Sequence, residues 1–251
     1  MITSQQWFSY FKNNLTVSKI NWNQPPSITQ AEVKTILKSL QAWQLGETSE
    51  GKSLLKACRK YVQKNGDLFY VHAMELFIKE EQKHGNNLGR YLDLIGAPRI
   101  KKDWGDSMFR IVRGINASME SWTLAVLTIE NAAQLFYQAL KDATGCNLLK
   151  EICTDILTDE APHIKFQQER FTEIFRKKKP FARNVAFCCY KYFYFSTSLV
   201  IWMAHRKLFK AGGIDYKTYS NQMHIKFWKT IGLLKQEITT AIIAPAGNQL
   251  A

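Results

Sequence analysis

The chain is poor in cysteine, and its few cysteines are not spaced as metal ligands or disulfide partners. They are Cys58, Cys146, Cys153, Cys188 and Cys189. This pattern argues against a zinc ribbon, a rubredoxin-type iron module and a disulfide-stapled secreted domain, and it suits a reducing compartment. Residues 1–10 also lack the apolar core of an export signal. We therefore expect a cytoplasmic protein.

Proline and glycine are also scarce, at 6 and 13 of 251 residues. So few helix breakers leave little room for long disordered tracts, and 46% apolar residues are enough to build a core. No segment alternates between apolar and polar residues as a half-buried strand would. The sequence therefore predicts a folded, all-α protein.

Acidic residues are few: the chain has 21 Asp and Glu but 34 Lys and Arg, which gives a formal net charge of +13. Such a balance gives either a solvated basic surface or attraction to an acidic partner, such as RNA, anionic lipid or an acidic redox protein. The chain carries no RNA-binding signature, such as an RNP-type aromatic motif. Nucleic acid therefore remains an alternative that no motif supports.

Helical periodicity and turn residues divide the chain into three parts. We expect an aromatic N-terminal arm over residues 1–28, a helical bundle over 29–176 and a helical extension over 177–251. The expected helices cover residues 29–64, with a bend at Gly46, then 67–95, 118–142, 144–176, 183–210 and 216–243. Two hairpins joined by a long connector over residues 96–116 predict a four-helix bundle with one long crossover.

One motif occurs twice in the expected bundle. Residues 80–84 read Glu-Glu-Gln-Lys-His and residues 159–163 read Asp-Glu-Ala-Pro-His, so both have the form acid-Glu-x-x-His. A step of three residues places Glu and His on one helical face, one turn apart. Apolar residues share that face in both helices, which predicts that it is buried. Buried carboxylates need a positive partner, and a metal ion would supply it. The ligand candidates are Glu81, His84, Glu160 and His163.

The other two bundle helices offer further carboxylates. Glu130 lies on the apolar face of the third helix, and both Glu47 and Glu50 lie on that of the first. Glu130 is as many residues from the turn at Gly145 as Glu160 is, and Glu50 is about as many from the turn at Gly66 as Glu81 is. Equal rise along paired helices would place these carboxylates at the same level of the bundle. We therefore expect Glu50 as the first-helix ligand, with Glu47 as an alternative ligand or a mobile carboxylate.

One Glu from each of two helices, with Glu-x-x-His from each of the other two, resembles the ferritin-like di-iron and di-manganese carboxylate proteins. The resemblance covers residues 40–176, and Gly-Glu-Thr-Ser-Glu at 46–50 is similar to a ligand stretch of rubrerythrins. It implies a ferritin-like fold with two iron ions, or manganese or a mixed pair as alternatives. As in the ribonucleotide reductase small subunit, Glu80 and Asp159 would accept hydrogen bonds from the ligand histidines.

Pro162 departs from the family pattern, because members often have a charged or polar residue at that place. It should kink the helix or force a bulge beside the site. Tyr137, one helical repeat beyond Glu130, is either a redox-active or hydrogen-bonding tyrosine or simply a core aromatic. The remaining histidines lack companions at ligand spacing and are expected to be structural or surface residues: His72, His205 and His224.

Residues 186–204 form an apolar segment in which only Lys191 is charged, with basic clusters on both flanks. Its length reaches that of a membrane span, so a packed helix, peripheral membrane contact and a true span are the alternatives. The overall composition favours a helix packed on the bundle or on a second subunit. Such a helix could line a substrate entrance or a homodimer interface.

The resemblance implies three classes of function. The first is oxidation of an organic substrate by O2, with electrons from an external ferredoxin or reductase. The second is iron or peroxide handling, as in ferritins and rubrerythrins, and the third is a non-catalytic binding module. The chain lacks the four-cysteine module of rubrerythrins and, unlike ferritins, continues for some 75 residues beyond the bundle. We therefore expect an oxidase or oxygenase.

Overall fold

A computed structural model describes residues 1–103 and 118–232. Its regular elements are α1 (Ser4–Asn14), α2 (Gln30–Glu47), α3 (Lys52–Asn65), α4 (Leu68–Leu94), α6 (Met119–Asp142), α7 (Asn147–Arg176), α8 (Pro180–Ala211), α9 (Tyr216–Phe227) and a π-helical turn, η1 (Trp228–Gly232). No strand occurs among these described residues, so the expected all-α class is confirmed. Most of the connector expected over 96–116, and the end of the last expected helix, lie outside the described residues.

Side chains that satisfy free backbone N–H groups fix where several helices begin. Thr29 and Glu32 form a capping box at the start of α2, in which each side chain accepts a hydrogen bond from the other's backbone. Asp67 caps α4 by accepting a bond from the Tyr70 backbone N–H. Ser118 caps α6 in the same way.

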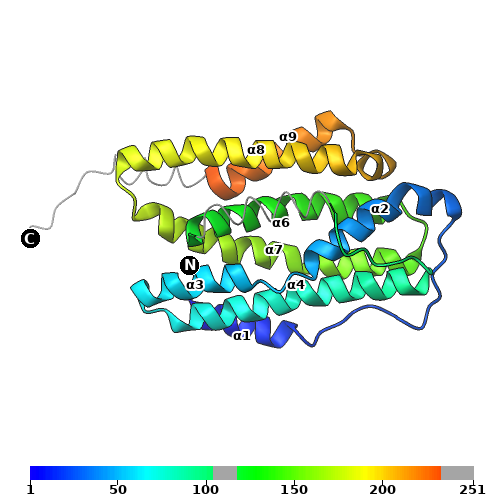
Figure 1. Ribbon diagram of the computed structural model, residues 1–251, viewed down its shortest axis with the longest axis horizontal. Helices are drawn as coiled ribbons and strands as arrows, with labels where there is room; N and C mark the ends of the chain where they lie inside the picture. Colours follow the sequence, from blue (N-terminus) through cyan, green and yellow to red (C-terminus); the bar gives the residue numbers. More distant parts are fainter. Residues whose placement is uncertain (104–117, 233–251) are drawn as a thin grey trace, which may run out of the picture.

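The expected N-terminal arm contains a helix. A Thr3–Gln6 capping box starts α1, and the side chains of Trp7 and Phe11 are buried against the bundle. Figure 1 shows α1 lying along α4 on the outer side of the bundle, and an extended segment then leads to α2. The N-terminal arm therefore supplies a helix that packs beside the four helices expected for the bundle.

The first bundle helix is broken. The sequence predicts one helix over 29–64 with a bend at Gly46, but α2 ends at Glu47 and α3 begins at Lys52. Gly51 has a φ of 62°, a left-handed conformation that favours glycine, and its Cα faces the side chain of Ile78 on α4. The break lies beside the candidate site and changes which carboxylate reaches it.

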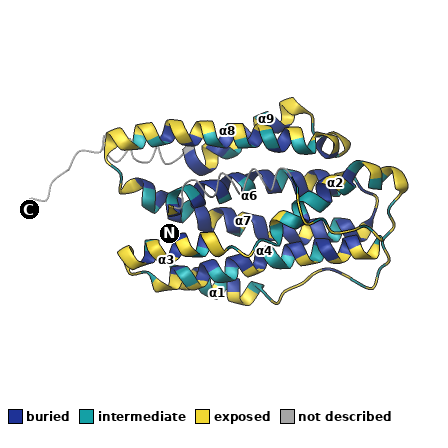
Figure 2. Cartoon of the chain, in the orientation of Figure 1, coloured by how far each residue is buried: buried dark blue, intermediate teal, exposed yellow. Residues whose placement is uncertain are grey.

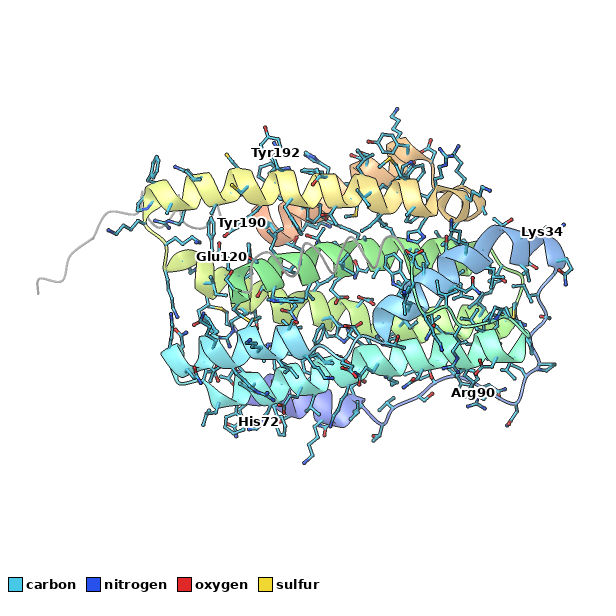
Figure 3. All side chains as sticks on the ribbon, viewed as in Figure 1. Lys34, His72, Arg90, Glu120, Tyr190 and Tyr192 are labelled. Carbon is cyan, nitrogen blue, oxygen red and sulfur yellow. The ribbon has the colours of Figure 1, made fainter. Side chains whose placement is uncertain are left out.

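The helices form two hairpins with a further layer on one side. α3 pairs with α4 and α6 pairs with α7, while α8 runs along the outside of α6 and contacts α9 (Figure 1). Figure 2 shows buried residues on the inner faces and exposed residues on the outer face of α8. The Tyr190 hydroxyl hydrogen-bonds to Glu120 and joins α8 to α6, whereas Tyr192 points outward (Figure 3).

The core consists of two apolar clusters with a polar layer between them. One is built around α1, α3 and the first half of α4, and it includes Phe77 and Ile78. The other is built around α6, α7 and α8 and includes Leu88 of α4. Between Ile78 and Leu88 lie Glu81 and His84, so the candidate site occupies the polar layer.

The described residues bear on two expectations about the long helices. α7 runs through Pro162 as an α-helix, without the π-helical bulge that was one of its expected effects. None of the helices in the described part is both long and apolar enough to cross a membrane. α8, which contains the apolar segment 186–204, packs on α6 and α2.

Candidate metal centre

Buried and partly buried acidic and histidine side chains from four helices meet in the polar layer. Two groups of three have ligand atoms within 4.8 Å of one another, and each group could hold a metal ion. The first group is Glu47 of α2 with Glu81 and His84 of α4. The second is Glu81 again, with Glu130 of α6 and His163 of α7. Because Glu81 belongs to both groups, it stands where a bridging ligand would.

Glu50 does not belong to this cluster. Its side chain is 69% exposed and forms an ion pair with Lys52, also an exposed residue. The expectation that Glu50 is the first-helix ligand assumed an unbroken helix up to Gly66. The break after Glu47 removes that register, and Glu47 is the carboxylate that reaches Glu81 and His84.

Glu160 completes the set of four carboxylates. It is fully buried, and neither of its oxygens has a hydrogen-bond donor. Burial and the neighbouring charge of Glu130 raise the pKa of Glu160 well above its ordinary value. A buried carboxylate without donors is costly unless a cation sits beside it, so Glu160 fits a metal site although it lies outside both groups.

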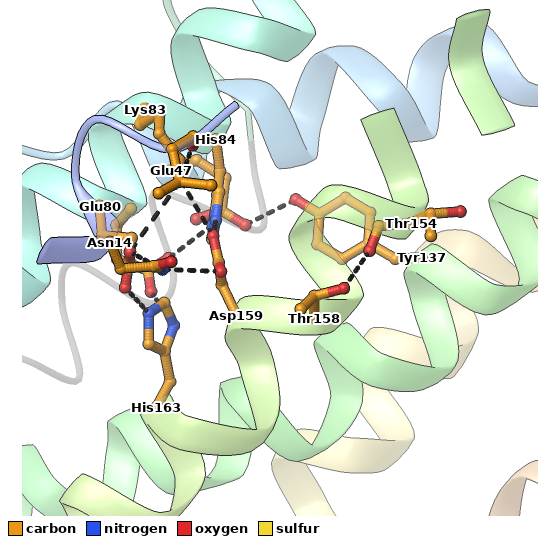
Figure 4. A network of polar contacts seen from close by, with 12 residues as sticks. Asn14, Glu47, Glu80, Lys83, His84, Tyr137, Thr154, Thr158, Asp159 and His163 are labelled. Atoms are coloured by element: carbon orange, nitrogen blue, oxygen red, sulfur yellow. Dashed lines mark hydrogen bonds and ion pairs between the residues drawn. The ribbon is translucent and has the colours of Figure 1, made fainter. Parts of the chain in front are cut away.

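The two motif histidines are held crosswise by the acids that precede the motif glutamates. The His163 Nε2–H donates to Glu80 over 2.7 Å, and the His84 Nε2–H donates to Asp159 over 3.0 Å. Each acid therefore holds the histidine of the opposite helix, as Figure 4 shows. Such carboxylate partners fix the ring orientation and the tautomer of a ligand histidine.

This tautomer directs the other ring nitrogen at the cluster. With the proton on Nε2, Nδ1 presents a lone pair, which is the form that binds a metal. The Nδ1 atom of His163 lies 2.7 Å from Glu81 Oε1, and that of His84 lies 3.8 Å from Glu81 Oε2. A lone pair facing a carboxylate is unfavourable unless a proton or a metal ion lies between them. The donor set therefore fits a cation.

The pKa values of the cluster carboxylates are spread apart by this crowding. Burial, with the charge of Glu81, raises the pKa of Glu47 well above its ordinary value and that of Glu130 to about 7. Burial acts in the same direction on Glu81. A proton on the facing Nδ1 atom of His163 outweighs it through its charge and its hydrogen bond, and so lowers the pKa of Glu81 well below its ordinary value. The four carboxylates of the cluster thus outnumber its two histidines, which can supply at most one positive charge each.

Two further contacts hold Glu47, one from Tyr137 of α6 and one from Trp43 of its own helix. Its Oε1 atom accepts hydrogen bonds from the Tyr137 hydroxyl, at 2.6 Å, and from Trp43 Nε1, at 3.0 Å. Burial and the charge of Glu47 raise the pKa of Tyr137 well above its ordinary value, so the phenol keeps its proton and donates it. Tyr137 thus has the hydrogen-bonding contact that was one alternative for it, and Trp43 is a partner that the sequence did not suggest.

Asn14, at the end of α1, was also not suggested by the sequence. Its side-chain amide donates to both acids that hold the histidines, to Glu80 and, over 2.9 Å, to Asp159 (Figure 4). Lys83 forms an ion pair with the same Asp159 at 3.1 Å. No ligand spacing marks Asn14, because it comes from a separate helix far away in the chain.

An apolar cavity of about 490 Å³ opens beside the cluster. Glu47, Glu81 and Glu130 form part of its wall. The rest comes from α2, α3, α4, α6 and α8, chiefly from apolar side chains. α8, for which the sequence suggested a substrate entrance or a dimer interface, lines this cavity.

Comparisons of the chain with protein-family models, with curated proteins and with solved structures found no match.

The two carboxylates of the first helix give a direct test of the register. Glu47→Ala should lose the ion held by Glu47, Glu81 and His84 and keep the other, because the second group does not contain Glu47. Glu50→Ala should keep both, since Glu50 is exposed. Metal per chain after loading with manganese or iron measures this. If only Glu50→Ala lost an ion, Glu50 would be the first-helix ligand, as the residue count from Gly66 predicts.

Asn14→Ala should weaken metal binding by about 10- to 100-fold, which is typical of lost contacts to the residues that orient metal ligands. The reason is that Glu80 and Asp159 lose a shared donor and the two histidines lose their fixed orientation. Titration of the ion with a competing chelator measures the affinity. The exposed neighbour in Asn13→Ala is the control, and equal affinities in the two variants would contradict a positioning role for Asn14.

Proposed function

We propose that this chain is a ferritin-like di-iron carboxylate protein that uses O2 to oxidise an organic substrate. The observation that carries the proposal is the opening of the Glu47–Glu81–Glu130 side of the cluster onto a cavity of about 490 Å³. Volumes of this order accommodate small organic ligands. A site that only stored iron would have no use for an apolar chamber beside its ligands.

The ligand set supports iron, with manganese or a mixed pair as alternatives. Carboxylate oxygens and imidazole nitrogens suit these metals, and no cysteine lies in either candidate group. Glu81 would hold one ion together with Glu47 and His84 and another together with Glu130 and His163, and Glu160 would complete the set. Two iron ions bound there would supply the reduction of O2.

The protein's own residues would then control where the oxidation occurs. Glu80 and Asp159 hold the two histidines in place, and Asn14 donates to both of these acids. Tyr137 keeps a proton at its hydroxyl beside Glu47. The apolar wall of the cavity would keep water away from the substrate. Insertion of one oxygen atom into the substrate and reduction of the other to water takes two electrons and two protons, which an external reductase or ferredoxin would supply. The net charge of +13 suits an acidic donor.

Iron stoichiometry tests the proposal against its runner-up, iron or peroxide handling. The protein, given excess ferrous iron in air, should retain two ions per chain in a small oligomer and should consume O2 with a chemical reductant. Retention of many ions per chain in a cage-sized assembly would instead indicate storage. Rapid turnover of hydrogen peroxide in preference to O2 would indicate a peroxidase, and failure to bind metal would indicate a non-catalytic module.

A further inference from the structure

The outer face of α8 carries a row of exposed apolar side chains. They follow one another at steps of four, three, four, seven and four residues, which keeps them on one side of the helix. This outer row consists of Phe181, Val185, Cys188, Tyr192, Leu199 and Met203. Phe181 and Tyr192 are each 80% exposed, and Figure 3 shows Tyr192 pointing away from the bundle. A helix that meets only water on its outer side usually carries polar residues there, so the outer row indicates a further contact.

The same part of the chain carries most of the positive charge. The C-terminal extension, residues 177–251, contains 12 Lys and Arg and only 2 acidic residues, whereas residues 1–176 contain 22 Lys and Arg and 19 acidic residues. The extension therefore supplies +10 of the formal net charge of +13. α8 itself contains five cations and no acid, and four of the five are exposed: Lys191, Arg206, Lys207 and Lys210. The outer row thus lies among cations, with a basic cluster at the C-terminal end of the helix.

Several kinds of partner could meet either the cations or the outer row, and one kind fits both. A second copy of this chain would bring cations against cations, because neither α8 nor α9 contains an acid to pair with them. A nucleic acid would contact the cations but would leave the outer row against phosphates and water. A bilayer with anionic headgroups satisfies both, because Lys and Arg contact the phosphates while apolar and aromatic side chains enter the boundary with the acyl chains.

We propose that the outer face of α8 docks on a membrane surface that contains anionic lipid, with the helix lying in the plane of that surface. The inner face of α8 stays packed on α6 and α2, so docking requires no rearrangement of the bundle. Because that inner face also lines the cavity, docking would hold the cavity one helix away from the lipid. The inference goes beyond the proposed function and does not depend on it, since no residue of the metal cluster takes part.

Vesicle binding tests the docking face. The whole chain is sedimented with vesicles of phosphatidylcholine alone and with vesicles that contain about a quarter phosphatidylserine. It should bind the anionic vesicles at least about tenfold more tightly, and this binding should weaken as added salt screens the cations. Absence of binding to the anionic vesicles, or equal binding to both kinds, would overturn the proposal.

Variants of the outer row test the apolar part of the contact. Phe181→Gln combined with Tyr192→Gln should weaken binding to the anionic vesicles by at least about tenfold, because two large side chains no longer enter the lipid. Leu68→Gln combined with Val17→Gln is the matched control, since both residues are exposed and apolar but lie on the α1 and α4 side of the bundle, away from α8 (Figure 1). Met203→Gln repeats the test if the double variant does not fold. Equal binding by the outer-row variant and the control would show that charge alone attracts the partner, as for a nucleic acid or an acidic protein, and would overturn the proposal.

Charge reversals test the cations in the same way. Arg206→Glu combined with Lys210→Glu should weaken binding to the anionic vesicles by at least about tenfold. Lys56→Glu combined with Lys60→Glu on α3 changes the net charge equally, at exposed positions with the same spacing, and should weaken it far less. Equal losses in the two variants would show that net charge, and not the face of α8, attracts the lipid. Sedimentation without lipid tests the second copy: a dimer that the outer-row variant separates would make this face a subunit interface and overturn the proposal.

Discussion

Glu81→Ala is expected to abolish metal binding at both positions of the cluster, which is the largest effect of any single substitution in the site. Glu81 is the one residue that the two candidate groups share. Its carboxylate faces the Nδ1 atoms of His84 and His163, at 3.8 and 2.7 Å. Without Glu81, each group keeps only two of the three side chains that could hold an ion.

Metal analysis after anaerobic loading with ferrous iron measures this effect, and the wild type should retain an ion at each of the two positions. Glu75→Ala, on the same helix but with a partly exposed side chain paired to Arg59, is the matched control and should bind like the wild type. Retention of one ion in Glu81→Ala would show that the two groups are independent and that Glu81 does not bridge them.

Much of the site could be predicted from the sequence because helical spacing is local. A step of three residues fixes Glu81 next to His84 and Glu160 next to His163, whatever the rest of the fold does. The acids one place earlier lie on an adjacent face. Each can therefore reach across to the opposite helix, as the Glu80–His163 bond does. The all-α class followed from the same periodicity.

The features that could not be predicted depend on breaks within helices and on contacts between residues far apart in the chain. The counting that favoured Glu50 required an unbroken helix, and Gly51 in a left-handed conformation breaks it. Asn14 reaches the site only because Trp7 and Phe11 bury α1 against the bundle, and no local pattern encodes that docking. The cavity is formed by side chains from five helices, so no segment alone predicts it.

A glycine on α4 controls how closely the Glu47 end of α2 can approach the site. A Cβ atom on Gly85 would lie 2.8 Å from the Thr48 Cγ2 atom and 3.0 Å from the backbone of both Glu47 and Thr48. Backbone atoms cannot rotate away as a flexible side chain can, so the helices would have to separate. The amide of Gln44 also donates to the Gly85 carbonyl at 3.4 Å, and this contact would stretch.

Gly85→Ala should therefore weaken the ion held by Glu47, Glu81 and His84 by at least about tenfold and cost about 1–3 kcal/mol of stability, as overpacking usually does. Gly46→Ala is the matched control, because a Cβ at Gly46 meets nothing within 4 Å. Both glycines lie inside helices, so both variants gain about 0.5–1 kcal/mol of helix propensity. The difference in stability and affinity between the two variants therefore measures the effect of the steric clash alone. Chelator competition gives the affinity and thermal unfolding gives the stability. If Gly85→Ala matched Gly46→Ala in both, the closeness of α2 to α4 would not be what brings Glu47 to the cluster.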